Sequence, residues 1–294
     1  MLLQQFANGV VGAAGYLVVA LSFAVVFNIC GFLNISHAIP YAAAPFVALI
    51  LIQHAGAPIW MSCLLGVVVS GIIGLLLMSA LIAPLERRAA TPMILLLASL
   101  GINTVFENVL SLACGDDPQS LLMGSSSQVL TLCGARVTVW QLAIVGFAVM
   151  FTVVASVASN TMRLGVAYRA VACDSELARI CGVPYEKVRF YSFLIGSLVA
   201  GISGVLVSLD TTLHPRMGLE ALLMAIVVVI VGGSRSIVGL VLASALLSAG
   251  QILGVWPTSS SWQNAVAFAL LFVVLMFRPQ GVLGQSTRRG YCSR

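Results

Sequence analysis

The sequence predicts an all-α fold, a polytopic membrane helical bundle with about eight to nine spans and one or two broken or re-entrant helices. Of the 294 residues, 60% are hydrophobic and only 8% are charged, whereas soluble proteins carry about 25% charged residues. No soluble domain could bury that much apolar surface, but a helix of about 20 apolar residues satisfies its own backbone within lipid. The apolar runs are continuous rather than alternating, which favours helices over a membrane barrel.

Apolar runs separated by short polar gaps predict the individual spans. They cover residues 9–30, 39–54, 59–83, 93–114, 139–159, 191–211, 221–231 with 237–254, and 263–277. The run 39–54 is short and follows the polar segment 31–37, which predicts a broken or re-entrant helix. Residues 232–236 interrupt the stretch 221–254, and such backbone is tolerated where it lines a cavity or meets water. No gap can hold a soluble catalytic domain, so residues 1–294 are expected to form a single transmembrane domain.

The basic residues gather in alternate gaps and thereby predict the orientation. The gaps 84–92 and 160–190 and the C-terminal tail are rich in arginine and lysine, whereas 115–138, 212–220 and 255–262 are poor. Basic loops stay in the cytoplasm, so the N-terminus is expected outside and the C-terminus inside, with Arg235 at a cytoplasmic elbow. We interpret the net charge of +5 as topology and lipid-headgroup contact, and expect no nucleic acid partner.

The cytoplasmic gap 160–190 carries the signals of a short helix over 175–181. Asp174 is a good N-cap, and Glu176 lies in the first turn, where a negative charge complements the helix dipole. Arg179 lies in the last turn, and Gly182 is the expected stop. The sequence therefore predicts a well-delimited helix between two spans.

Leu177, Ile180 and Cys181 fall on one side of that helix. Two roles stay open on spacing alone. The helix could cover the end of the bundle, or it could be presented to a soluble partner. A rigid amphipathic helix suits the second role, because little order is lost on docking.

Polar residues within spans are candidates for a substrate path, because they are expensive in lipid. Glu107 could line the path, pair with a basic group, or lie at the outer rim. His37 lies at a helix break, where helix ends and unwound backbone can hold a carboxylate or an ammonium group; a satisfied structural histidine is the alternative. The candidate path residues are Asn34, Ser36, His37, Asn103, Glu107, Pro215 and Gly218.

The seven cysteines show no pair with the spacing of a metal site, so we expect neither a metal nor a cofactor. Cys114 and Cys133 could face an oxidising compartment together, and a disulfide between them stays open. The chain also lacks the phosphate-binding pattern G-x-x-x-x-G-K-[ST], H-E-x-x-H and G-x-S-x-G. An intramembrane enzyme is therefore disfavoured.

Several short patterns occur in a fixed order along the chain. Gly31, Asn34 and His37 fit G-x-x-N-x-x-H, and Glu86 and Arg87 follow the third span. The remaining positions are Arg169-Ala170, Asp174, Ala178, Gly182-Val183 and Val188 in the cytoplasmic gap; Gly201, Gly204, Pro215 and Gly218; Gly232-Gly233, Ser236-Ile237 and Gly239; and Arg278-Pro279 with Gly281. Together they resemble the permease subunits of ABC importers for branched-chain amino acids, the LivH type. There are two departures, because Ala38 and Ile39 follow His37, and Arg235 replaces a glycine.

The resemblance implies a working assembly. Two ATP-binding ABC subunits would dock on the cytoplasmic helix, a second permease, homologous or identical, would complete the path, and a periplasmic binding protein would deliver the solute to the bacterial inner membrane. The implied ATPase-coupling residues are Asp174, Ser175, Glu176, Leu177, Ala178, Arg179 and Gly182. The implied solutes are branched-chain or other small amino acids, with urea and short amides as the alternative. An ion-coupled transporter or channel is the rival from another class, and Glu107 is its one plausible coupling carboxylate.

Overall fold

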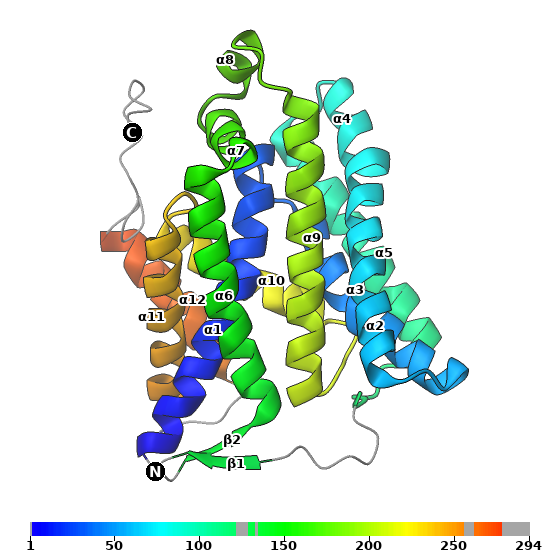
Figure 1. Ribbon diagram of the computed structural model, residues 1–294, viewed down its shortest axis with the longest axis vertical. Coiled ribbons are helices and arrows are strands. Elements are labelled where there is room, and N and C mark those ends of the chain that lie inside the picture. Colours follow the sequence, from blue (N-terminus) through cyan, green and yellow to red (C-terminus); the bar gives the residue numbers. More distant parts are fainter. Residues whose placement is uncertain (1, 122–128, 133–134, 256–261, 278–294) are drawn as a thin grey trace.

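The computed structural model describes residues 2–121, 129–132, 135–255 and 262–277. Most of the described chain is helical (Figure 1). The elements are α1 (Leu2–Cys30), the 3-10 turn η1 (Ile35–His37), α2 (Ala38–Ala55), α3 (Ile59–Leu77), the π-helical turn η2 (Met78–Ile82), α4 (Ala83–Arg87), α5 (Pro92–Cys114), β1 (Val129–Leu132), β2 (Ala135–Thr138), α6 (Val139–Thr161), α7 (Arg163–Cys173), α8 (Ser175–Ile180), α9 (Tyr185–Asp210), α10 (Met217–Gly232), α11 (Ile237–Val255) and α12 (Gln263–Phe277).

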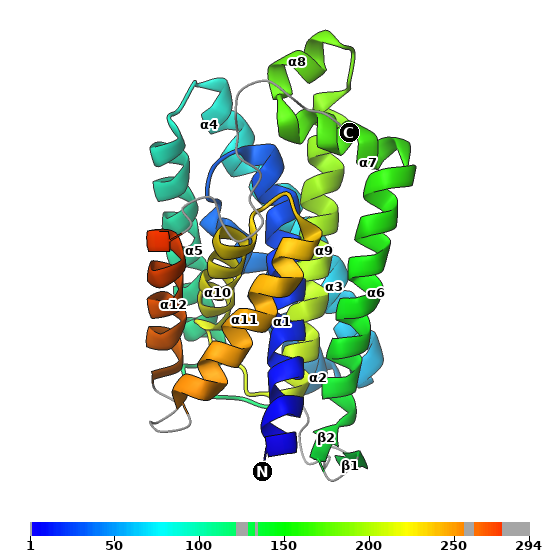
Figure 2. The same ribbon diagram turned by 90° about the vertical axis from the view of Figure 1, so that its left-hand side faces the viewer.

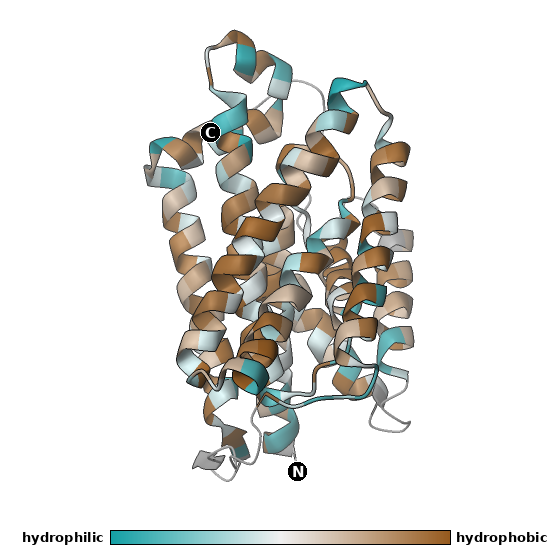
Figure 3. Ribbon diagram, turned by 90° about the vertical axis from the view of Figure 1, so that its right-hand side faces the viewer, coloured by the Kyte–Doolittle hydropathy of each residue, from teal (hydrophilic) through white to brown (hydrophobic). Residues whose placement is uncertain are grey.

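The long helices lie side by side in one bundle. Within the described residues, seven helices are long and apolar enough to cross a membrane, and α10 and α12 are shorter apolar helices. Apolar residues dominate the shafts, and hydrophilic residues gather at the two ends (Figure 3). These findings confirm the predicted polytopic bundle, and the chain is a multi-pass membrane protein. The structure adds a short antiparallel hairpin, β1–β2, which the all-α prediction did not contain.

The two ends of the bundle differ. Helices α4, α7 and α8 lie at one end, which we call the α8 end (Figures 1 and 2). The first residues of α1 and the β1–β2 hairpin lie at the other, which we call the N-terminal end. Gln4 fixes the hairpin there, because its side-chain oxygen accepts a hydrogen bond from the Arg136 backbone N–H at 2.7 Å.

Helix α1 is central, since it packs against α6, α9, α10 and α11. Close approach of the inner helices depends on small residues, as is usual between helices in membranes. The Gly204 position on α9 faces the Tyr41 carbonyl oxygen on α2, and a Cβ added there would overlap that oxygen. The bundle core is therefore built on backbone contact as much as on side-chain packing.

Several helix boundaries differ from the sequence prediction, and α1 already begins at Leu2 instead of residue 9. Helix α9 begins at Tyr185 instead of residue 191, because Pro184 at its N-cap position starts a helix that runs through the charged residues that follow. Helix α3 continues beyond the predicted end at residue 83, through η2 and α4, to Arg87. Both helices therefore extend further at the α8 end than their apolar runs indicate.

Helical structure breaks at 31–34 and at 233–236, where the sequence predicts interruptions, although Ile35–Ala55 is by itself long enough to cross a membrane. Helix α1 ends at Cys30, a non-helical stretch and η1 follow, and α2 begins only at Ala38. Helix α10 begins at Met217 after an irregular segment, which pairs with the loop after α5 through reciprocal backbone hydrogen bonds between Gln119 and Leu213 (3.0 and 2.7 Å). The interruption at 233–236 joins α10 to α11 as an elbow at the α8 end.

Candidate functional site

Helix α8 has the caps that the sequence predicts. Asp174 Oδ1 accepts hydrogen bonds from the backbone N–H groups of Glu176 and Leu177, both at 3.0 Å. At the other end, the Gly182 N–H donates to the Arg179 carbonyl at 3.0 Å, and Gly182 has φ +82°. That left-handed conformation suits glycine. The helix ends at Ile180, one residue before the predicted boundary.

Helix α8 turns its small side towards the bundle and its large apolar side chains away. Ala178 is buried in a cluster with Ile29, Val171 and Val188. Leu177 and Ile180 are 58% and 82% exposed. The apolar side predicted from spacing therefore faces outwards at the α8 end of the molecule (Figure 1).

Two contacts connect the α8 region to the shafts of the bundle. The Arg179 guanidinium lies 3.9 Å from the ring centroid of Tyr185, at the start of α9. One turn further along α9, Arg189 Nη1 donates to Glu86 Oε2 at 2.6 Å. Arg189 is only 3% exposed, and its Nε and Nη2 have no hydrogen-bond partner among the described residues. The pair joins α9 to α4.

The elbow between α10 and α11 is tied to the same region. Arg235 Nη2 donates to the Ala172 carbonyl at 2.7 Å, near the C-terminal end of α7, where a positive charge is favoured by the helix dipole. Asn28 Nδ2 donates to the Ser234 carbonyl at 2.8 Å and to the Tyr168 hydroxyl at 3.3 Å. Burial raises the pKa of Tyr168 to about 12, so its hydroxyl stays protonated. The departure at Arg235 thus has a structural use.

The candidate path residues of the first break are buried together. Asn34, Ser36 and His37 are all nearly inaccessible. Ser36 Oγ donates to Asn34 Oδ1 at 2.6 Å, and the Ile35 N–H donates to Ser99 Oγ on α5 at 3.1 Å. The turn before α2 is therefore fixed against α5.

His37 points to a different side of the turn. Its Nε2 lies 3.2 Å from Ser22 Oγ on α1, and its ring centroid lies 6.0 Å from that of Phe23. The imidazole lies beside Gly196 on α9, because a Cβ added there would be in van der Waals contact with His37 Cε1 at 3.5 Å. The histidine is packed between α1 and α9.

Asn103 and Glu107 lie one turn apart on α5. Asn103 Nδ2 donates to Glu107 Oε1 at 2.8 Å; Asn103 is buried and Glu107 is half-buried. Ser99, which holds η1, precedes them at the same spacing, so the three side chains form a polar stripe along one face of α5.

Pro215 and Gly218 mark the second break. Both are buried, and a Cβ on Gly218 would lie 2.6 Å from the Ala38 carbonyl oxygen at the start of α2. The starts of α2 and α10 therefore lie side by side. The structure places Asn34, Ser36 and Gly218 at the start of α2. Asn103 and Glu107 lie one and two turns beyond Ser99 on α5, and the α8 residues lie at one end of the molecule.

Two sequence features reach beyond the described residues. Cys114 is a free cysteine, and Cys133 lies outside the described residues, as does the pattern 278–284.

The sequence analysis missed the Glu86–Arg189 pair. Charges of opposite sign near the ends of two spans, on the same side of the membrane, were the available signal.

The chain is similar to known transport proteins over nearly its whole length. Residues 5–275 match the family described as "Branched-chain amino acid transport system / permease component". The high-affinity branched-chain amino acid transport system permease protein BraD of Pseudomonas aeruginosa is 27% identical over 96% of both chains. The corresponding permease protein LivH is 29% identical in Salmonella typhimurium and 28% in Escherichia coli K12, again over 96% of both chains.

One solved structure shares the fold. It is described as "PsaBC from Streptococcus pneumoniae in complex with Fab", and the match covers 91% of this chain and 90% of that chain. The TM-score is 0.50 at 12% identity. The similarity concerns the arrangement of the helices.

Proposed function

Because the chain belongs to the family of branched-chain amino acid transport permease components, we propose that it is the membrane-spanning subunit of an ABC importer for branched-chain or other small amino acids. Separate ATPase subunits hydrolyse the ATP, and a binding protein delivers the solute to this chain and a second permease in the inner membrane. The observation that carries the proposal is α8, a capped helix with exposed Leu177 and Ile180 at the end of an apolar bundle.

We further propose that the α8 end faces the cytoplasm. Eight of the ten described basic residues belong to α4, α7, α8, α9 and the elbow, or follow them directly, whereas Arg136 lies in β2 at the N-terminal end and Arg216 directly precedes α10. This distribution supports a cytoplasmic α8 end. The N-terminus then lies outside, and the tail after α12 lies in the cytoplasm.

Movement of the ATPases reaches the bundle through the contacts of α8 with α9. When the two ATPase subunits close on ATP, they shift α8. The Arg179–Tyr185 contact carries this shift to α9, and the Arg189–Glu86 ion pair carries it from α9 to α4. The elbow between α10 and α11 moves with α7, because Arg235 in the elbow donates a hydrogen bond to the Ala172 carbonyl of α7. ATP drives transport because it binds the inward and outward states with different affinity.

Reconstitution tests the function and the orientation together. We expect proteoliposomes that contain this chain, its partner permease, the ATPases and the binding protein to accumulate labelled leucine only when ATP is present on the side of α8. The chain alone, under a sodium or proton gradient, should not accumulate leucine. Gradient-driven uptake by the isolated chain would instead support the ion-coupled rival, and a need for ATP on the N-terminal side would contradict the orientation.

Glu107 is proposed to bind the ammonium group of the solute. Asn103 holds the Glu107 carboxylate in place through its hydrogen bond. We expect Glu107→Gln to lower uptake at least about tenfold, the loss of one charge-assisted hydrogen bond, while the ATPases still co-purify. Asp117→Asn, in the exposed outer loop, is the matched control and should keep normal uptake. Equal uptake by the two variants would remove Glu107 from the path.

A further inference from the structure

A polar cleft lies between α1, α11 and α12. Its volume is about 330 Å³, and it is lined by Gln5, Asn8, Gly12, Tyr16, Ser248, Gln251, Ile252 and Gln263. No aspartate, glutamate, lysine, arginine or histidine belongs to this lining. A cluster of uncharged amide and hydroxyl groups within apolar helices is unfavourable in lipid, so it indicates contact with water or a polar solute.

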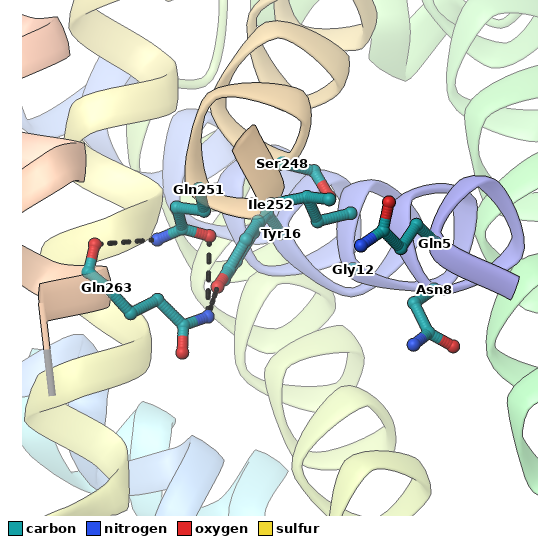
Figure 4. A pocket seen from close by; sticks show the side chains of 8 residues that line it. All are labelled: Gln5, Asn8, Gly12, Tyr16, Ser248, Gln251, Ile252 and Gln263. Carbon is teal, nitrogen blue, oxygen red and sulfur yellow. Dashed lines mark hydrogen bonds between the residues drawn. The ribbon is translucent and has the colours of Figure 1, made fainter. Parts of the chain in front are cut away.

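The cleft runs from the N-terminal end towards the middle of the bundle. Gln5 lies near the start of α1 and Tyr16 three turns further along, so the lining extends about 17 Å at 1.5 Å per residue. That is about half of the 30 Å hydrocarbon thickness. Figure 4 shows Gln251, Gln263 and Tyr16 converging at one end of the cleft, while Gln5 and Asn8 lie further along α1.

The amide groups at the inner end bond mainly to one another and to Tyr16, whose hydroxyl accepts a hydrogen bond from Gln263 Nε2 at 3.2 Å. Gln251 is only 4% exposed. Its Nε2 donates to the Gln263 carbonyl at 3.4 Å and to Met224 Sδ at 3.7 Å, and its Oε1 accepts from Gln263 Nε2 at 3.5 Å. The two contacts between Gln251 and Gln263 are longer than the 2.7–3.2 Å range of good N–H···O bonds. A buried amide in this state gains when a ligand supplies a closer partner.

The same face of α1 carries a second cavity beyond the cleft. Phe23 and Phe27 follow Tyr16 by two and three turns and therefore share its side of the helix. They line a cavity of about 200 Å³ with Leu33, Ile226, Val229, Ile230, Gly233 and Ser234. This cavity is apolar and adjoins the break before α2. Between the two cavities, Val19 and Ala20 are buried in the core.

We propose that the polar cleft is the outer binding site of the solute, and that it selects small solutes of zero net charge through hydrogen bonds to Tyr16, Gln251 and Gln263. An uncharged lining neither repels nor neutralises a zwitterion, whereas a solute with net charge would lose its hydration without gaining a counter-charge. The apolar cavity on the same face of α1 then receives the aliphatic part of the solute. The proposal rests on the importer function proposed above.

Zwitterionic aliphatic amino acids and short neutral amides share this chemistry. Three probes separate the sources: leucine, acetamide and lysine, each presented to the complete reconstituted importer. We expect uptake of either leucine or acetamide. The probe that is taken up shows whether the natural solute is a zwitterionic amino acid or a neutral amide. Lysine as the preferred solute of the cleft would overturn the selection rule.

The decisive comparison places the same bulky side chain inside and outside the cleft. Asn8→Trp fills the cleft, whereas Val10→Trp lies on the opposite, exposed face of α1. At saturating loaded binding protein, we expect the number of solutes carried per ATP to fall at least about tenfold for Asn8→Trp, as for the loss of one productive binding contact. Val10→Trp should stay within about twofold of the native chain.

Gln251→Leu is the second variant, and it decides the matter if Asn8→Trp fails to assemble. It removes the buried amide at nearly constant volume, and we expect the same loss of solute carried per ATP. Gln53→Leu, an exposed amide near the end of α2 outside the cleft, is its control. Unchanged stoichiometry in the Gln251 variant would show that the cleft holds only water. A native complex without ATP-driven uptake would instead refute the importer function itself.

Discussion

Replacing both Leu177 and Ile180 by aspartate is expected to reduce ATP-driven uptake to background and to release the ATPase subunits during purification. Both side chains are largely exposed, so the change should leave membrane insertion and the fold intact. Full burial of one such side chain in a partner groove contributes about 1.5–3 kcal/mol. Loss of both therefore weakens docking by roughly a hundredfold or more.

Co-purification of the ATPases and uptake by proteoliposomes measure this effect. The matched control exchanges the two residues, Leu177→Ile with Ile180→Leu, which preserves the apolar area and adds no charge. We expect that control to bind the ATPases normally. If the aspartate variant still retained them, helix α8 would not be the docking element.

Glu86→Ala should be strongly destabilising, although Glu86 itself is half-buried. Its removal leaves the Arg189 guanidinium buried without a counter-charge, and breaking a buried pair in this way costs about 3–5 kcal/mol. Arg87→Ala, at the exposed neighbouring position, should be close to neutral. The yield of folded protein in detergent and its thermal unfolding measure the difference, and equal stability of the two variants would contradict the assignment.

A double replacement separates the contribution of the Glu86–Arg189 pair to folding stability from its contribution to the coupling between the ATPases and transport. Glu86→Leu with Arg189→Met removes both charges, and apolar replacements of buried ion pairs are often neutral or stabilising. We expect this variant to fold and to bind the ATPases, yet to carry fewer solutes per ATP. Normal coupling in the double variant would restrict the pair to a structural role.

The positions of the spans could be predicted from the sequence because lipid requires long apolar helices. The faces of those helices could not. In lipid an apolar side chain is equally acceptable inside and outside, so hydrophobicity does not mark the buried face. Trp60, on α3, is largely exposed, whereas Ser62 and Ser70 on the same helix are buried.

The local signals at α8 were sufficient because capping depends on neighbouring residues only. Asp174 and Gly182 fix both ends of that helix without help from the rest of the fold. The start of α9 was placed too late, because Arg189 was counted as a loop charge. Its burial depends on Glu86, which is distant in the sequence. Likewise, the grouping of Tyr16, Gln251 and Gln263 depends on three helices whose relative rotation no local pattern reports.

The hydrogen bond from Arg235 to Ala172 has a consequence for how the sequence of this region can vary during evolution. The acceptor is a main-chain oxygen, and every amino acid carries that atom. Mutation at position 172 therefore leaves the acceptor in place as long as α7 stays helical, whereas mutation at position 235 removes the donor. The requirement for a particular residue rests on one partner alone, so relatives that carry arginine at 235 in place of the family's glycine should still vary freely at 172.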